Sequence, residues 1–222
     1  RTNTKAFATV GVIEGVLKKQ TGAILDLSEQ QLVDCSKSGS YGCSGGNYDS
    51  ALSYAKTNGM MLESAYQYTA KDGACKYSAS AATYKIASTF NVAMSGAKQA
   101  VYDHGPVAFA LDANTLQSYT GGIVSNTAAC NKGVNHAVVL YGWGSNYLLV
   151  RNSWGSTWGE SGSFRFLKSF FLSFFLVSRD ETHSLTFPPR THFVHAHTHR
   201  LTVGACLSTT WAAAGATSTM GP

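Results

Sequence analysis

Apolar residues recur at helical spacing near the start of the chain. Between Ala6 and Leu17 the apolar positions lie three or four residues apart, and Thr21-Gly22 follows the run. An apolar stripe of this period is typical of an amphipathic helix, and glycine commonly follows the last helical turn. We therefore expect a buried helix from Ala6 that ends near Gly22.

Two more helices are expected before about Thr89. Ser28-Glu29-Gln30-Gln31 has the spacing of a capping box, in which the serine hydroxyl accepts from the third backbone N–H and the glutamine reaches back. A short helix through Leu32 and Val33 would follow. A third helix is indicated by apolar residues on one face and by a closing Asn58-Gly59. Its apolar positions are Tyr48, Ala51, Leu52 and Ala55.

Beyond Thr89 the pattern changes to short apolar runs separated by glycine-rich turns. Val107–Leu111, His136–Tyr141 and Tyr147–Val150 are predicted to be strands. Helices followed by strands favour an α+β fold with two lobes over alternating βαβ units. We expect a helical lobe over residues 6–89, a β-rich lobe over residues 90–168, and a cleft between them that can hold a functional site.

Residues 169–222 differ in character from the rest. The apolar run Ser169–Val177 is about half of the roughly 20 residues needed to span a bilayer, so a membrane helix is not expected. Alternating histidines in Thr191–His199 could bind a metal, but nothing fixes their geometry, and no metal site is assigned. We expect this tail to be disordered, or to result from an error of splicing or gene annotation.

Composition excludes some classes of function. The chain has 222 residues, a formal net charge of +5 and only 13% charged residues. Lysine and arginine are scattered, which gives little support to nucleic-acid binding. The chain begins with Arg1, and no secretory signal can be recognised. Five widely spaced cysteines argue against a zinc ribbon and favour disulfides in an oxidising compartment, with at least one thiol unpaired.

Two polar residues at strand ends suggest chemistry. Taken alone, His136 at the start of an apolar strand is more simply interpreted as a core histidine. The segment Val150–Gly162 changes this interpretation, because a strand there ends in Asn152 and is followed by two tryptophans and several glycines. Neighbouring strands can place the asparagine amide against one imidazole nitrogen, which leaves the other nitrogen to face a nucleophile.

From about Ala6 to Lys168 the chain resembles the papain and cathepsin L family of cysteine peptidases. Besides the histidine and asparagine segments, motifs at the family's spacings carry the resemblance. They are Ala6-Phe7, Glu14-Gly15, the run from Leu27 to Cys35, the run from Gly42 to Gly46, Gly105-Pro106-Val107 and Gly121-Gly122-Ile123.

The resemblance implies a papain-like fold with a helical left lobe and a β-barrel-like right lobe, here truncated at both ends. It also implies that a thiolate–imidazolium pair cleaves peptide bonds through an acyl-enzyme, without a cofactor. In that scheme His136 is the general base and acid, Asn152 orients it, and Trp154 covers their hydrogen bond. The family further implies a monomer that is lysosomal or secreted, with no nucleic-acid or membrane partner.

The resemblance also implies where a substrate binds. Gly45 and Gly46 match the turn that holds a peptide or protein substrate in extended form. The main specificity pocket would be lined by Asn47, Tyr48, Ala110 and Ala137, with a bulky apolar substrate residue as the expected occupant.

The chain departs from the family at the nucleophile. The family places a cysteine and a tryptophan directly before Ala6-Phe7, where this chain has Thr4 and Lys5. The glutamine of the oxyanion hole would precede residue 1. Loss of a nucleophile costs about a million-fold in turnover, and loss of one oxyanion donor about a hundred-fold. We expect a peptidase domain that is inactive as written. The alternative is a catalytically dead homologue that binds peptides.

The family also implies a pairing of cysteines. Cys35 and Cys75 match a family disulfide, whereas the partner of Cys43 would lie upstream of residue 1. The partner of Cys130 would lie near the family's C-terminus, and Cys206 is one candidate, although its surroundings do not resemble the family. Both termini contribute strands to the right lobe in the family, so we expect an unpaired sheet edge here.

Overall fold

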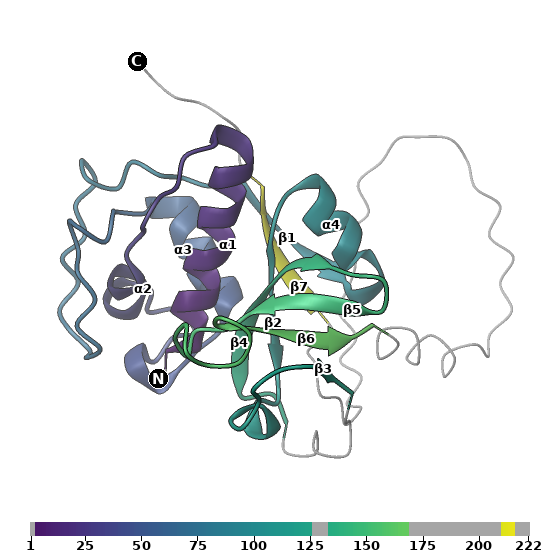
Figure 1. Ribbon diagram of the computed structural model, residues 1–222. Helices are drawn as coiled ribbons and strands as arrows, with labels where there is room; N and C mark the ends of the chain where they lie inside the picture. The colour runs from purple at the N-terminus through teal and green to yellow at the C-terminus, as the bar shows by residue number, and fades with distance from the viewer. Residues whose placement is uncertain (1–2, 126–132, 169–209, 216–222) are drawn as a thin grey trace, which may run out of the picture.

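The computed structural model describes residues 3–125, 133–168 and 210–215. Three helices lie on one side of a single sheet, and the long helix α1 (Thr4–Thr21) is the one next to it, whereas the short helix α4 (Ala97–Asp103) lies on the other side (Figure 1). The predicted α+β class is therefore confirmed. The boundary expected between residues 89 and 90 falls within a strand, β1 (Ser88–Ala93).

All three predicted helices are present. α1 covers Thr4–Thr21 and ends at Gly22, whose φ of 73° is left-handed and whose N–H donates to the Lys18 carbonyl. α2 covers Glu29–Cys35, and α3 covers Tyr48–Asn58 and ends before Gly59. A positive φ is easy for glycine, which explains why the chain can leave the first helix at this point.

The capping box before α2 forms only in part. The Ser28 hydroxyl accepts from the Gln31 N–H at 3.0 Å, as predicted. The Gln31 side chain does not reach back to Ser28. Its amide nitrogen donates to the Gly59 carbonyl at 2.9 Å, and its amide oxygen accepts from the Met61 N–H at 2.7 Å. These tertiary contacts satisfy two buried backbone groups of the segment after α3, which outweighs local capping.

The sheet has seven strands in the order β1-β7-β2-β4-β5-β6-β3. The three predicted strands are β2 (Val107–Leu111), β4 (His136–Trp143) and β5 (Tyr147–Arg151). Short elements that the sequence pattern did not predict complete the fold. They are α4 (Ala97–Asp103), β3 (Ile123–Val124), β6 (Ser163–Leu167), β7 (Thr210–Gly215) and the 3-10 turns Gly42–Ser44, Met94–Gly96 and Asn114–Leu116.

Strand β7 corrects the expectation of a disordered tail and an unpaired edge. It lies between β1 and β2 and runs antiparallel to both, with Phe90 opposite Ala213 and Val107 also opposite Ala213. The expectation is wrong for Thr210–Gly215. The remainder of residues 169–222, including the apolar run, the histidine-rich stretch and Cys206, lies outside the described residues, as does Cys130.

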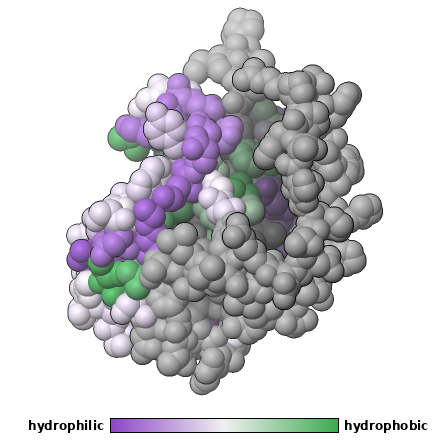
Figure 2. All heavy atoms as spheres, turned by 90° about the vertical axis from the view of Figure 1, so that its right-hand side faces the viewer, coloured by the Kyte–Doolittle hydropathy of each residue, from purple (hydrophilic) through white to green (hydrophobic). Residues whose placement is uncertain are grey.

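Strand β4 separates two apolar cores. Ala137 and Val139 face the core built on α1, whereas Val138 and Leu140 face the core built with β5, β6 and α4. This alternation follows from the two-residue period of a strand. On the side of the sheet away from α1, the coloured part of the surface is mostly hydrophilic, with a few hydrophobic patches (Figure 2). Among the described residues no helix is both long and apolar enough to cross a membrane.

The predicted disulfide between Cys35 and Cys75 is present, with the two Cα atoms 4.8 Å apart. It joins the end of α2 to the long loop that follows Tyr66. The Tyr66 hydroxyl donates to Asp34 at 2.8 Å beside it, so the loop is also held by a buried hydrogen bond. Cys43 carries a free thiol.

Replacing Gly15 with alanine should destabilise the contact between α1 and the sheet. A Cβ at this position would lie 2.4 Å from Cγ of Pro106, directly before β2. We expect the free energy of unfolding to fall by about 1–3 kcal/mol, the usual cost of overpacking. Gly11→Ala is the matched control on the same helix, because its Cβ would lie 3.4 Å from Val139. Equal stabilities of the two variants in denaturant titrations would contradict this packing.

Candidate active site

His136 and Asn152 lie side by side, as the sequence predicted. His136 is the first residue of β4, and Asn152 directly follows the neighbouring strand β5. Nε2 of His136 lies 2.7 Å from Oδ1 of Asn152. Both residues are 6% exposed. The antiparallel pairing of β4 with β5 therefore brings together two polar residues that are 16 positions apart.

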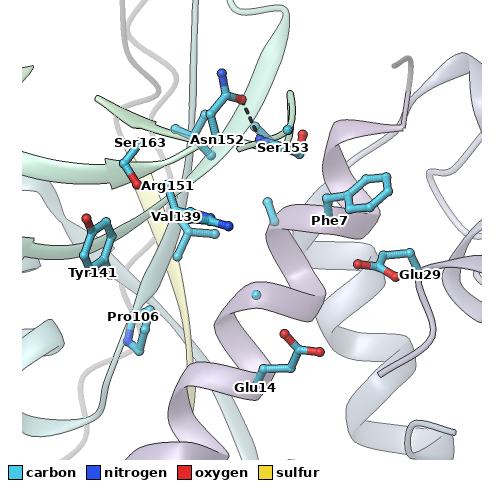
Figure 3. Close-up of a pocket in the computed structure, with 15 residues that line it drawn as sticks. Phe7, Glu14, Glu29, Pro106, Val139, Tyr141, Arg151, Asn152, Ser153 and Ser163 are labelled. Atoms are coloured by element: carbon cyan, nitrogen blue, oxygen red, sulfur yellow. Dashed lines mark hydrogen bonds between the residues drawn. The ribbon is translucent and has the colours of Figure 1, made fainter. Parts of the chain in front are cut away.

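The hydrogen bond also fixes which imidazole nitrogen carries the proton. Oδ1 of Asn152 accepts from the Ser153 N–H at 2.8 Å as well, which identifies this atom as the carbonyl oxygen of the amide (Figure 3). Because a carbonyl oxygen can only accept, Nε2 of His136 must donate. In the neutral ring, Nδ1 is then unprotonated and can act as a base.

Trp154 lies against the pair, in the place that the sequence predicted. Its ring centroid is 4.9 Å from that of His136, at an interplanar angle of 43°. Trp158 packs edge-on against Trp154 at 5.1 Å, and the Trp158 indole N–H donates to the Leu116 carbonyl at 3.1 Å. Trp158 thus holds in place the indole of Trp154, which covers the histidine.

Burial lowers the pKa of His136 below its usual value, and the hydrogen bond that the ring donates to Asn152 opposes this shift. The charged form of a buried group loses solvation, which explains the direction. At neutral pH the imidazole is therefore a neutral base.

Thr4 reaches the same site from the other end of the chain. It is the first residue of α1, and its hydroxyl oxygen accepts from the Ala137 N–H at 3.2 Å. Together with His136 and Trp154 it lines a pocket of about 530 Å³. The positive end of the α1 dipole therefore points at this pocket.

Residues that the sequence analysis missed, most of them polar, form the rest of this pocket. Its remaining lining residues are Ala113, Asn114, Gln117 and Asn135. Asn135 could have been suspected because it directly precedes His136. Asn114 and Gln117 carry no local signal, since they become neighbours of the histidine only through the β2–β4 pairing.

The residues expected to bind a substrate lie in the turn before α3, at the start of α3, and in strands β2 and β4. Gly45 and Gly46 lie between the 3-10 turn and α3, with φ of 110° and 144°. Asn47 caps α3 by accepting from the Asp49 N–H at 2.8 Å, and Tyr48 is 7% exposed. Ala110 is partly buried against the α1 core, and Ala137 is 6% exposed. Their role in specificity stays a prediction.

Lys5 lies beside the turn that contains Gly46. Its side chain is 1% exposed, and Nζ has no hydrogen-bond partner among the described residues. A Cβ on Gly46, whose φ is 144°, would lie 2.9 Å from Nζ and also 2.9 Å from the backbone of Gly39 and Ser40, so the turn requires glycine. Burial, with a smaller effect of Lys37, lowers the pKa of Lys5 to about 8.

A second pocket of about 560 Å³ lies between α1 and strands β4 and β5. Glu14 and Glu29 point toward one another on its helical side, whereas Tyr141, Arg151 and Asn152 lie on its sheet side (Figure 3). Burial raises the pKa of each glutamate to about 7. No group of three or more metal-ligating side chains occurs among the described residues.

Comparison with known proteins finds extensive similarity. Residues 3–171 match the family described as "Papain family cysteine protease". The chain is 38% identical over 168 residues to digestive cysteine proteinase 2 of Homarus americanus, which covers 71% of this chain and 52% of that protein. It is 39% identical over 177 residues to procathepsin L of Mus musculus, and this match covers 73% of this chain and 53% of that protein. The chain thus spans about half the length of these curated relatives.

A solved structure extends the similarity. Digestive procathepsin L 3 of the Tenebrio molitor larval midgut superposes with a TM-score of 0.75 and 31% identity, over 96% of this chain and 62% of that one. The predicted papain-like fold is therefore confirmed. The match over most of the chain, with the helix, strand and pocket geometry described above, assigns the protein: it belongs to the papain family of cysteine proteases.

Proposed function

We propose that this chain is a cysteine endopeptidase domain that keeps the base and its orienting residue but lacks the nucleophile, and that it does not cleave peptides as written. One observation carries the proposal. Thr4 lies at the start of α1, on the wall of the pocket that contains His136 and Trp154. This is the position from which a side chain on α1 would attack a bound peptide.

The chemistry of threonine supports the second half of the proposal. A hydroxyl has a much higher pKa than a thiol, so it does not form a stable anion beside an imidazole. One lone pair of the Thr4 oxygen already accepts the Ala137 N–H. His136 then has no thiolate to stabilise its charged form, and its lowered pKa favours the neutral ring.

The test restores the thiol. Thr4→Cys is expected to react with an epoxysuccinyl thiol probe at residue 4, located by peptide mass spectrometry, whereas the unaltered chain should not react there. Thr4→Ser is the matched control, because it keeps a hydroxyl. Adding His136→Ala to Thr4→Cys should slow labelling by about a hundred-fold or more, within the range for loss of a general base. Peptide cleavage by the unaltered chain that His136→Ala abolishes would overturn the proposal.

Cys43 gives an internal reference for this experiment. Burial and the nearby Asp72 raise the pKa of its thiol. Its labelling should therefore be slow and unaffected by His136→Ala.

A second candidate is a pseudopeptidase that binds extended peptides without cleaving them. The intact arrangement of His136, Asn152 and Trp154 favours it, because a site that had lost all function would not need to keep them. Calorimetric titration with a peptide that carries a bulky apolar residue separates the candidates. Binding to the unaltered chain, with no labelling of Thr4→Cys, favours the pseudopeptidase.

For the protein from which this chain comes, we also propose protein or peptide substrates bound in extended form, a monomeric state, and a lysosomal or secreted location. Family membership and the Cys35–Cys75 disulfide support these proposals, since disulfides persist in oxidising compartments.

A further inference from the structure

Asp112 is a buried acid close to the candidate site. It follows β2 directly and is 5% exposed. The preceding residue, Leu111, is paired with His136 across the β2–β4 ladder. The carboxylate therefore lies next to the point at which the strand that carries the histidine begins.

One oxygen of this carboxylate collects three hydrogen bonds. Oδ1 of Asp112 accepts from the Asn114 N–H at 3.0 Å and from the Asn114 side-chain amide at 2.6 Å. It also accepts from the side-chain amide of Asn135 at 3.1 Å. Hydrogen bonds to a charged oxygen are stronger than neutral ones, so the three donors are firmly held.

Asn135 is consequently held on three sides. Besides the bond to Asp112, its own N–H donates to the Leu111 carbonyl at 3.1 Å. Its side-chain oxygen accepts from the Ala113 N–H at 2.9 Å. These contacts join the residue before His136 to the end of β2 and to the turn after it. The backbone from which the histidine side chain starts is thus fixed by polar contacts and not by the strand ladder alone.

The same carboxylate holds part of the wall of the pocket that Thr4 lines. Asn114 and Asn135, both bonded to Asp112, line the pocket with Thr4, His136 and Trp154. A single buried group therefore sets both the position of the base and the shape of the cavity that it faces.

The position of the base needs such support. Asn152 holds Nε2 of His136, and Trp154 covers one face of the ring, but neither fixes the Cα atom. A displacement of about 1 Å in a reacting group can cost about a hundred-fold in rate. The contacts of Asn135, together with the strand ladder, fix the backbone position of His136.

We propose that Asp112 is a positioning residue for His136, which acts through Asn135 and at the same time fixes Asn114 in the wall of the same pocket. The inference rests on the proposed function only for its meaning in catalysis, because the geometry that it predicts can be measured in the unaltered chain.

Nitrogen NMR of the His136 ring tests the proposal without any activity. The unaltered chain should show a proton fixed on Nε2. Asp112→Ala should give a mixture of the two tautomers, because release of Asn135 lets His136 move away from Asn152, whose carbonyl oxygen holds the proton on Nε2. Asp112→Asn keeps an acceptor oxygen and should restore most of the fixed state. Ring signals that are unchanged in Asp112→Ala would overturn the proposal.

A control and a second variant separate positioning from stability. Glu160 is another acid of the same lobe and forms an ion pair with Arg165. Glu160→Gln removes its charge and should lower stability without altering the signals of the His136 ring. Asn135→Ala removes the link but leaves Asp112 bonded to Asn114, so it decides the question if Asp112→Ala does not fold. It should reproduce the tautomer mixture, and a ring that stays fixed would overturn the proposal.

The catalytic consequence is measured in the Thr4→Cys background. Asn135→Ala should reduce the rate of probe labelling at residue 4 by about ten-fold or more, and Asp112→Asn by much less, as expected for a misplaced base. If Thr4→Cys itself does not react, the proposed function fails, while the NMR result still decides the role of Asp112. Equal labelling rates in Thr4→Cys with and without Asn135→Ala would overturn the positioning role.

Discussion

Replacing Lys5 with methionine is expected to raise the free energy of unfolding by about 3 kcal/mol at pH 7, which is what lowering a pKa from 10.5 to about 8 corresponds to. The amine is 1% exposed and has no hydrogen-bond partner among the described residues, so its charged form is poorly compensated. Methionine has a similar length and no charge to bury. Urea titration of the two chains measures the difference.

The gain from Lys5→Met should depend on pH. In the unfolded chain the amine keeps a pKa near 10.5, so between about pH 8 and 10.5 the unfolded state binds more protons than the folded state. The stability of the unaltered chain therefore rises with pH through this window, and the advantage of methionine shrinks. Lys18→Met, at the exposed end of α1, is the control and should change stability little. A gain that is equal at pH 7 and pH 10.5 would contradict this explanation.

The chain should become less stable as the pH rises from 4.5 to 7. Glu14 and Glu29 each have a pKa raised from 4.5 to about 7, so in this window the folded state binds more protons than the unfolded state. Each shift corresponds to roughly 3 kcal/mol, but both carboxyls are partly exposed, and we expect a loss of about 2 kcal/mol per group. Urea titrations at the two pH values measure it.

Glutamine variants test this origin. Glu14→Gln keeps the oxygen that accepts from the Leu27 N–H at 2.8 Å, and Glu29→Gln removes the other charge. The double variant should have a nearly flat stability profile between pH 4.5 and 7. Glu29→Gln should lose about half of the slope, and Glu14→Gln more than half, because repulsion by Glu14 is part of the shift of Glu29. A double variant with the slope of the unaltered chain would assign the slope to other groups, such as Glu63, whose pKa is also raised by burial.

The main features that sequence alone could predict are those that depend on one element or on two adjacent strands. The apolar stripe of α1 predicted that helix, and the glycine after it predicted where the helix ends. His136 and Asn152 could be paired because β4 and β5 are consecutive strands joined by a short turn, so the end of one must lie near the start of the other.

Features that depend on which elements pack together could not be predicted. Glu14 and Glu29 belong to different helices, and only the packing of α1 against both α2 and the sheet buries the two carboxyls. Gln31 matched a local capping pattern, but its amide bonds to residues about 30 positions away. Strand β7 has an Ala-rich sequence with no clear alternation of polar and apolar residues, so the sequence pattern did not predict a strand there.

The bond from the Ala137 N–H to Thr4 has a consequence for how the cleft opens. It joins the start of α1 to β4 across the site, between residues 133 positions apart in the chain. Sulfur is a weaker acceptor than a hydroxyl oxygen, so a cysteine at this position would hold the two sides less firmly. Amide hydrogen exchange at Ala137 should therefore be slower in the unaltered chain than in Thr4→Cys, and the version without a nucleophile is the more tightly closed of the two.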